Sequence, residues 1–364
     1  MISAGLVLGH ASSGHILMVA GRFASSRSHL EEGHALYDPI SHCSLGYRVG
    51  IDPHLYSQAV LAIALLCLGF PDQALAQCSA AIAESRRVGH PPSLALSLSI
   101  GCRLLSLFGD NAALRERADE MVDLATERGL PFWRALGAMY RGYSKVKNGD
   151  VAEGKALLRS GLSAYHASTG AVLWLPYYTA LLAEASEIGG QIDEAVAQLD
   201  DALQIVDRTK ERWFAAELNR HKGQLLLRHG QVEAAEEDYR KALSVAVDQE
   251  AKLWELRAAV SLARLRRDQG RRPEARELLA PVYGRFTEGF DTPDRKGAAR
   301  RACLICLVAF CLRCTGNFIE VRRRRWCCRG VTSGALLRRF DLMLSWSPTP
   351  RSSRAKVSLL AHRN

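Results

Sequence analysis

The chain has 364 residues, of which 48% are hydrophobic, and it carries a formal net charge of +10. This apolar content supports a large core or a long repeat array and excludes a fully disordered chain. The charge lies at one end, because residues 292–364 hold 16 basic and 3 acidic side chains, whereas residues 1–291 hold 32 and 35. A nearly neutral body argues against nucleic-acid binding by residues 1–291, since such surfaces are strongly basic.

Neither a secretion signal nor a membrane span is predicted. Residues 1–21 have no basic start, and His10 and Ser12 interrupt their apolar character. The uncharged apolar runs at 59–70 and 302–312 are too short to cross a bilayer. We therefore expect a cytoplasmic protein with reduced thiols and no membrane partner.

Glycine recurs along the body at nearly constant spacing. The positions are Gly21, Gly69, Gly109, Gly149, Gly190, Gly230 and Gly270. The first interval is 48 residues and the others are 40 or 41. Glycine accepts the left-handed conformation that ends a helix, and the polar residues and prolines that follow suit a helix start. Second breaks lie about halfway between, at Gly89, Gly129 and Gly170. Each unit is thus predicted to be two helices of roughly 18 residues.

Small residues recur at fixed distances from each of these glycines. Seven residues before them lie Gly14, Ala62, Cys102, Gly142, Ala183, Gly223 and Ala263. Five residues after them lie Ser26, Ala74, Leu114, Gly154, Ala195, Ala235 and Ala275, of which Leu114 breaks the rule and predicts a wider helix pair. Small side chains let two helices cross closely, so these positions predict where the helices of a pair meet.

This pattern resembles the tetratricopeptide repeat family. The best match is the unit near Glu217, with Gly223, Gly230, Ala235 and Tyr239 at the consensus spacings of the family. The usual period is about 34 residues, and here it is about 40. The resemblance implies an all-α solenoid of about seven antiparallel helix pairs over residues 1–291. It also implies a binding or regulatory scaffold, not an enzyme, and no cofactor.

Several phrases resemble a narrower bacterial group. They are Leu36-Tyr37-Asp38-Pro39, Gly89-His90-Pro91, Arg212-Trp213 and Phe286-Thr287-Glu288-Gly289-Phe290-Asp291-Thr292-Pro293-Asp294. In that group an adenylate/guanylate cyclase domain and a P-loop ATPase precede a C-terminal repeat region. The resemblance implies a role in regulation and partner sensing for these repeats, with the cyclase or ATPase domains of a parent protein as possible partners. This sequence contains no phosphate-binding Gly-x-x-x-x-Gly-Lys-Ser/Thr motif of its own.

In tetratricopeptide arrays the first helix of each unit lines a concave groove. The resemblance places these residues there: Arg103, Met139, Tyr143, Tyr177, Glu184, Arg220, Gln224, Arg257 and Arg264. Aromatic and arginine side chains together are typical of peptide grooves, although each position could equally be an ordinary exposed or inter-helix one. We predict a protein or peptide partner. The alternatives are a sensor that binds a small effector in the groove and a nonfunctional gene fragment.

Residues 292–364 form a basic tail rich in cysteine and arginine that breaks the repeat. The tail is predicted to be disordered or read out of frame. The spacing Cys303-x-x-Cys306-x4-Cys311-x-x-Cys314 is also compatible with zinc or iron–sulfur, but the residues between lack Gly, Pro and Asn for a turn. The arginine run at 322–325 could bind nucleic acid or anionic lipid.

Three patterns in the body carry weaker chemical alternatives. His29 and His34 flank two glutamates, but a spacing of five turns the two rings about 140° apart on a helix, so no zinc site is expected. His42 and Cys43 could form a nucleophile pair, yet no orienting residue is placed nearby in the sequence. Tryptophan recurs near the start of four first helices and is predicted to wedge between repeats: Trp133, Trp174, Trp213 and Trp254.

Overall fold

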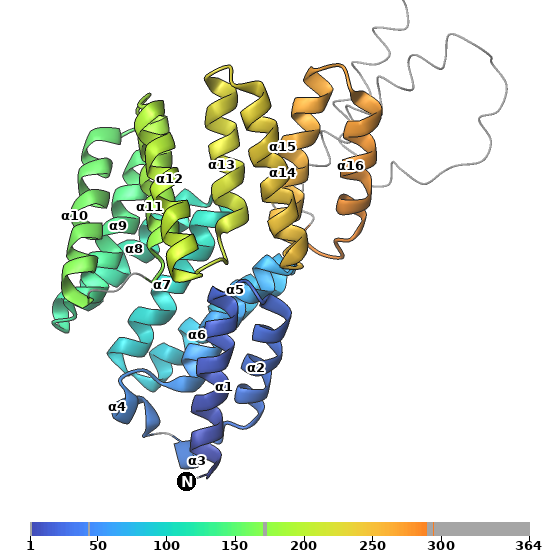
Figure 1. Ribbon diagram of the computed structural model, residues 1–364. Coiled ribbons are helices and arrows are strands. Elements are labelled where there is room, and N and C mark those ends of the chain that lie inside the picture. Colours follow the sequence, from blue (N-terminus) through green and yellow to red (C-terminus); the bar gives the residue numbers. More distant parts are fainter. Residues whose placement is uncertain (1, 43, 170–172, 290–293, 295–364) are drawn as a thin grey trace, which may run out of the picture. The chain divides into compact units, whose positions relative to one another are not determined.

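The computed structural model describes residues 2–42, 44–169, 173–289 and 294, all within the unit Met1–Phe310. These residues form helices and no strands (Figure 1). Seven consecutive helix pairs follow one another: α1 (Ile2–Val19) with α2 (Phe23–Ala35), α5 (Pro53–Cys67) with α6 (Pro71–Val88), α7 (Pro91–Phe108) with α8 (Asn111–Glu127), α9 (Pro131–Lys147) with α10 (Val151–Thr169), α11 (Leu175–Ile188) with α12 (Ile192–Thr209), α13 (Ala215–Arg228) with α14 (Val232–Asp248), and α15 (Lys252–Asp268) with α16 (Arg272–Gly284). The predicted helical repeat is therefore confirmed. The long first interval holds two extra short helices, α3 (Pro39–His42) and α4 (Leu45–Val49).

The predicted turn glycines end the first helix of every pair. All seven have a positive φ, from 73° at Gly109 to 104° at Gly149. The breaks between pairs are less uniform, because Lys210 and Glu250 adopt φ values of 62° and 54° without being glycine. A positive φ is strained for a residue with a side chain, and the flanking helices hold these two turns in that conformation. Because neither residue is a glycine, the sequence does not indicate it.

The small residues lie where paired helices cross, as predicted. A Cβ on Gly142 would stand 2.7 Å from the carbonyl oxygen of Gly154, and one on Gly154 would stand 2.5 Å from that of Gly142. A Cβ on Gly223 would lie 2.9 Å from the ring of Tyr239. These distances leave no room for a larger side chain, so the crossings of α9 with α10 and of α13 with α14 depend on glycine.

Tryptophans link successive repeats, in agreement with the predicted wedge. The rings of Trp174 and Trp213 lie 5.3 Å apart, edge to face. Trp254 donates its indole N–H to the carbonyl oxygen of Trp213 at 3.0 Å. Phe214 bridges the two later tryptophans, 5.0 Å from one ring and 5.4 Å from the other. Buried aromatic pairs of this kind fix the stacking of one helix pair on the next.

The first helix pairs also contact the last ones. The carbonyl oxygen of Val19 at the end of α1 accepts hydrogen bonds from the amides of Arg212 and Trp213, at 2.8 and 3.0 Å. At the start of α6, the amides of Asp72 and Gln73 donate to the carboxylate of Glu288 at 2.9 and 3.1 Å. Segments far apart in the sequence are therefore in direct contact.

Helix α7 is unusually apolar. Judged by length and composition alone, α7 could cross a membrane. The segment from α3 to α5 meets the same criterion only if its bent parts are counted together as one span. In α7, 61% of that 18-residue window is buried inside the protein. Its apolar side chains are thus already used by the core of the array. Arg103 interrupts its apolar run, so the sequence alone did not distinguish this helix as a span candidate.

Candidate functional site

A cavity of about 410 Å³ lies between the first helices of successive repeats. Its walls come from the C-terminal end of α7 and from α9, α11, α13 and α15, with Asp294 at one side. Seven of the nine predicted groove residues line it: Tyr143, Tyr177, Glu184, Arg220, Gln224, Arg257 and Arg264. The structure thus brings most of the predicted set together, while their role in binding stays a prediction.

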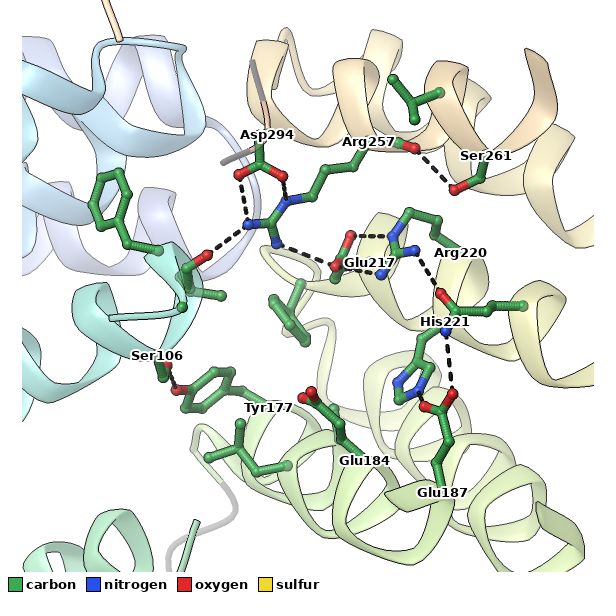
Figure 2. A pocket seen from close by; sticks show the side chains of 18 of the residues that line it. Ser106, Tyr177, Glu184, Glu187, Glu217, Arg220, His221, Arg257, Ser261 and Asp294 are labelled. Carbon is green, nitrogen blue, oxygen red and sulfur yellow. Dashed lines mark hydrogen bonds and ion pairs between the residues drawn. The ribbon is translucent and has the colours of Figure 1, made fainter. Parts of the chain in front are cut away.

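A chain of charged groups crosses one wall of this cavity (Figure 2). The guanidinium of Arg257 forms a fork with the carboxylate of Asp294, with Nε–Oδ1 and Nη2–Oδ2 distances of 2.8 Å. Arg257 also donates from Nη1 to Glu217 at 3.2 Å and from Nη2 to the carbonyl oxygen of Leu107 at 2.6 Å. Glu217 in turn accepts two bonds of 2.8 Å from Arg220. The two arginines share one buried carboxylate.

The charge state of Glu217 follows from these neighbours. Burial opposes ionisation of its carboxyl group, but the cations of Arg220 and Arg257 more than compensate and lower its pKa to about 2. Burial likewise disfavours the charge of Arg257, and the carboxylates of Asp294 and Glu217 outweigh it, so the pKa of Arg257 is raised. Glu217 and Arg257 are therefore both charged at neutral pH.

The opposite wall consists of neutralised pairs. Glu184 accepts from the hydroxyl of Tyr143 and from Lys147, both at 2.7 Å. Glu187 accepts from His221 at 2.6 Å and from Arg228 at 2.5 Å. Burial alone would raise the pKa of Glu187. The hydrogen bond and charge of His221 lower this pKa by more than burial raises it, so the net result is a decrease. This wall offers little unbalanced charge to a ligand.

Arg264 differs from the other cations of the cavity. Its side chain is exposed, and it makes no ion pair with any residue that the structure describes. Partial burial, together with repulsion by Arg267 and Arg220, lowers its pKa without removing its charge. Apolar side chains of α11, α13 and α15 complete the lining: Leu181, Phe214, Leu256 and Val260. The cavity therefore has a mixed polar and apolar lining, with the exposed guanidinium of Arg264 open to a ligand.

Comparisons with known proteins support the fold. No family model matches the chain. An uncharacterized protein of Rhizobium meliloti (strain 1021) is 27% identical over 250 residues, which are 67% of this chain and 24% of that protein. The chain thus spans about a quarter of the length of this relative. A Rap protein solved in complex with Competence and Sporulation Factor superposes with a TM-score of 0.51 and 12% identity, over 84% of this chain and 99% of that one. This solenoid is tetratricopeptide-like.

Two further solved structures give lower TM-scores. A tetratricopeptide repeat protein from Parabacteroides merdae gives a TM-score of 0.41 at 11% identity, over 81% of this chain and 99% of that one. The apo form of RapI gives a TM-score of 0.46 at 12% identity, over 82% and 98% of the two chains.

Two predicted groove residues of the tetratricopeptide-like array do not line the cavity. Met139 is fully buried beneath Gly161, where α9 crosses α10. Arg103 is 2% exposed, with its guanidinium 3.8 Å from the ring centre of Trp174 and its Nη2 bonded to the hydroxyl of Tyr178 at 2.8 Å. Neither faces the cavity, because aromatic side chains from later repeats cover Arg103 on α7, and Met139 packs at the crossing of α9 with α10.

Sequence reasoning missed several residues of the cavity. Glu217 lies 40 residues after Tyr177 and 40 before Arg257, so the repeat register that gave those two would also have given it. Three more cavity residues lie on the same helices, within four positions after a predicted groove residue: Lys147, Glu187 and His221. Asp294 had no comparable signal, because it lies beyond the last helix pair.

The weaker chemical alternatives gain no support from the described residues. The ring of His29 faces His10, with 3.3 Å between their Nδ1 atoms, whereas His34 stacks on His54 at 4.6 Å. No cluster of three metal-ligating side chains occurs in this part of the chain. His42 is buried, and its predicted partner Cys43 lies outside the described residues, as does the whole cysteine and arginine tail except Asp294.

Proposed function

We propose that this protein is a non-catalytic scaffold that holds a segment of a protein or peptide partner in the cavity between its first helices. The observation that carries the proposal is the combination of a mixed polar and apolar lining with the open guanidinium of Arg264. Peptide segments are recognised in this way, by pockets for apolar side chains and a few polar groups that fix orientation.

The tetratricopeptide-like fold supports this proposal. The Rap protein that superposes on this chain was solved in complex with Competence and Sporulation Factor, so an array of this fold is able to hold a partner. The groove residues predicted from the repeat register are also those that converge here, since seven of nine line one cavity.

We further propose that the array is the regulatory region of a larger signalling protein with cyclase or ATPase domains, acting in the cytoplasm. The family phrases in the sequence support this, and so does the relative from Rhizobium meliloti, of which the chain covers 24%. Sequencing the locus upstream of Met1 tests the idea. An open frame that runs into this chain and encodes a cyclase or ATPase is expected, and an in-frame stop codon directly upstream would contradict it.

Binding in the cavity is tested by filling it. Ser261 lines the cavity on α15 and is only partly buried, so Ser261→Trp places a large side chain in the space where a ligand would lie. The control is Glu116→Trp, at an exposed position of α8 that lies outside the cavity. Peptides selected from a display library on the wild-type chain should lose at least about tenfold in affinity for Ser261→Trp alone. Equal binding by all three proteins would refute the cavity as the site.

A further inference from the structure

Asp294 differs from the other carboxylates of the cavity. It comes from the chain beyond the last helix pair, whereas Glu184, Glu187 and Glu217 lie on the helices that form the walls. Its side chain is 22% exposed and that of Glu217 is 9% exposed. Its only ion-pair partner among the described residues is Arg257, while Glu217 is held by two arginines. Asp294 is therefore the most readily exchanged carboxylate on this wall.

The chain leading to Asp294 is anchored to the second repeat. The carboxylate of Glu288 accepts hydrogen bonds from Gln73 Nε2 at 2.8 Å as well as from two amides at the start of α6. The amide of Gly289 returns a bond of 3.0 Å to the carboxylate of Asp72. This reciprocal contact fixes the chain five residues before Asp294, so the carboxylate of Asp294 stays close to the cavity even when its ion pair opens.

The arginine wall has an excess of positive charge without Asp294. Among the described residues, Glu217 would then be the remaining ion-pair partner of Arg220 and Arg257, Arg264 has none, and the Nε of Arg257 would lose the acceptor that it has there. A guanidinium presents a rigid fork of donors that matches a carboxylate in two parallel bonds. The group that fits the vacated fork is thus another carboxylate, and the nearby Leu256 and Val260 suit an apolar neighbour on the same ligand.

We propose that Asp294 is a tethered competitor for the partner. A peptide partner presents the carboxylate of an aspartate or glutamate side chain to the fork of Arg257, and it must displace Asp294 to do so. This inference rests on the proposed function, because it names the chemistry of the peptide that the cavity takes. A competitor that occupies the fork about nine-tenths of the time weakens the apparent affinity of the partner about tenfold.

The test compares two fluorescent pools of pentapeptide amides by anisotropy. One pool has Asp at the centre and mixed apolar residues elsewhere, and the other has Asn at the centre. The full-length chain is compared with Asp294→Asn and with Asp123→Asn, which removes the same charge from an exposed position of α8 outside the cavity. Asp294→Asn should bind the Asp pool about tenfold more tightly than the wild type does. The variant and the wild type should bind the Asn pool with the same affinity. Asp123→Asn should behave as the wild type.

Arg257→Lys keeps a positive charge but lacks the fork. In this background the preference for the Asp pool should disappear, and adding Asp294→Asn should no longer tighten binding. Circular dichroism of each variant checks that the helices are intact.

The outcomes separate the two proposals. If Ser261→Trp abolishes binding but Asp294→Asn leaves the affinity for the Asp pool unchanged, the competitor role is wrong and the peptide cavity stands. If Ser261→Trp binds both pools as well as the wild type does, the cavity is not the site and both proposals fail. No binding of the Asp pool by Asp294→Asn up to about 1 mM would also overturn the competitor role.

Discussion

Glu211 is a buried carboxyl group whose ionisation should oppose folding at neutral pH. It is 2% exposed and lies in the turn between α12 and α13. Its oxygens accept the backbone amide of Trp174 at 2.8 and 3.0 Å and the indole N–H of Trp213 at 3.1 Å. Burial raises its pKa from 4.5 to about 7, and these two donors and the charge of Arg103 only partly offset the effect.

The sign of the effect follows from proton binding. Between pH 4.5 and 7 the folded protein keeps the proton of Glu211, whereas the unfolded chain releases it. The contribution of Glu211 to stability is therefore fully present below pH 4.5 and is lost as pH rises to about 7. A rise in its pKa from 4.5 to about 7 corresponds to about 3 kcal/mol between these limits. Glu211→Gln removes the ionisation and keeps an acceptor oxygen, so it should be more stable than the wild type at pH 8.

Thermal unfolding followed by circular dichroism measures this difference. For an array of this size, about 3 kcal/mol should raise the Tm of Glu211→Gln by about 5 °C at pH 8, with no gain at pH 4. Glu277→Gln, at an exposed position of α16, serves as the control and should follow the wild type at both pH values. A constant Tm difference between Glu211→Gln and the wild type from pH 4 to pH 8 would refute the reasoning.

Three further predictions concern the other buried groups. Gly154→Ala should destabilise the fold by about 2 kcal/mol, because its Cβ would lie 2.5 Å from the oxygen of Gly142, whereas Gly5→Ala has open space and should be neutral or stabilising in denaturant melts. Glu217→Gln should cost about 3 kcal/mol at pH 7, since Arg220 loses its buried counter-ion and Arg257 keeps only Asp294; the cost should shrink from pH 4.5 to 2, because the unfolded wild-type chain gains the proton before the folded one does. Burial raises the pKa of Cys78 to about 11, so mass spectrometry should find this thiol unalkylated in the folded protein and labelled after denaturation.

The array could be predicted from the sequence because its determinants are local and repeated. A glycine that must adopt positive φ recurs at the end of each first helix, and small residues recur at each crossing. The turns at Lys210 and Glu250 show the limit of this signal, because their conformation is imposed by the flanking helices and not by residue type. Repetition also explains why seven groove residues converge, because the residues six, ten and thirteen positions before each turn glycine recur with the period of the array.

The two predicted groove residues that do not line the cavity show what a repeat register does not contain. Arg103 and Arg264 each lie six residues before a turn glycine, yet Arg103 is enclosed by Trp174, Tyr177 and Tyr178, and Arg264 is open to the cavity. The register sets the direction of a side chain on its own helix, but the residues that cover it come from other repeats. Asp294 belongs to the same class, because it reaches Arg257 through the anchored chain at Glu288. The charge balance of the cavity thus depends on contacts between distant segments, and only a structure reveals which of its cations a partner can reach.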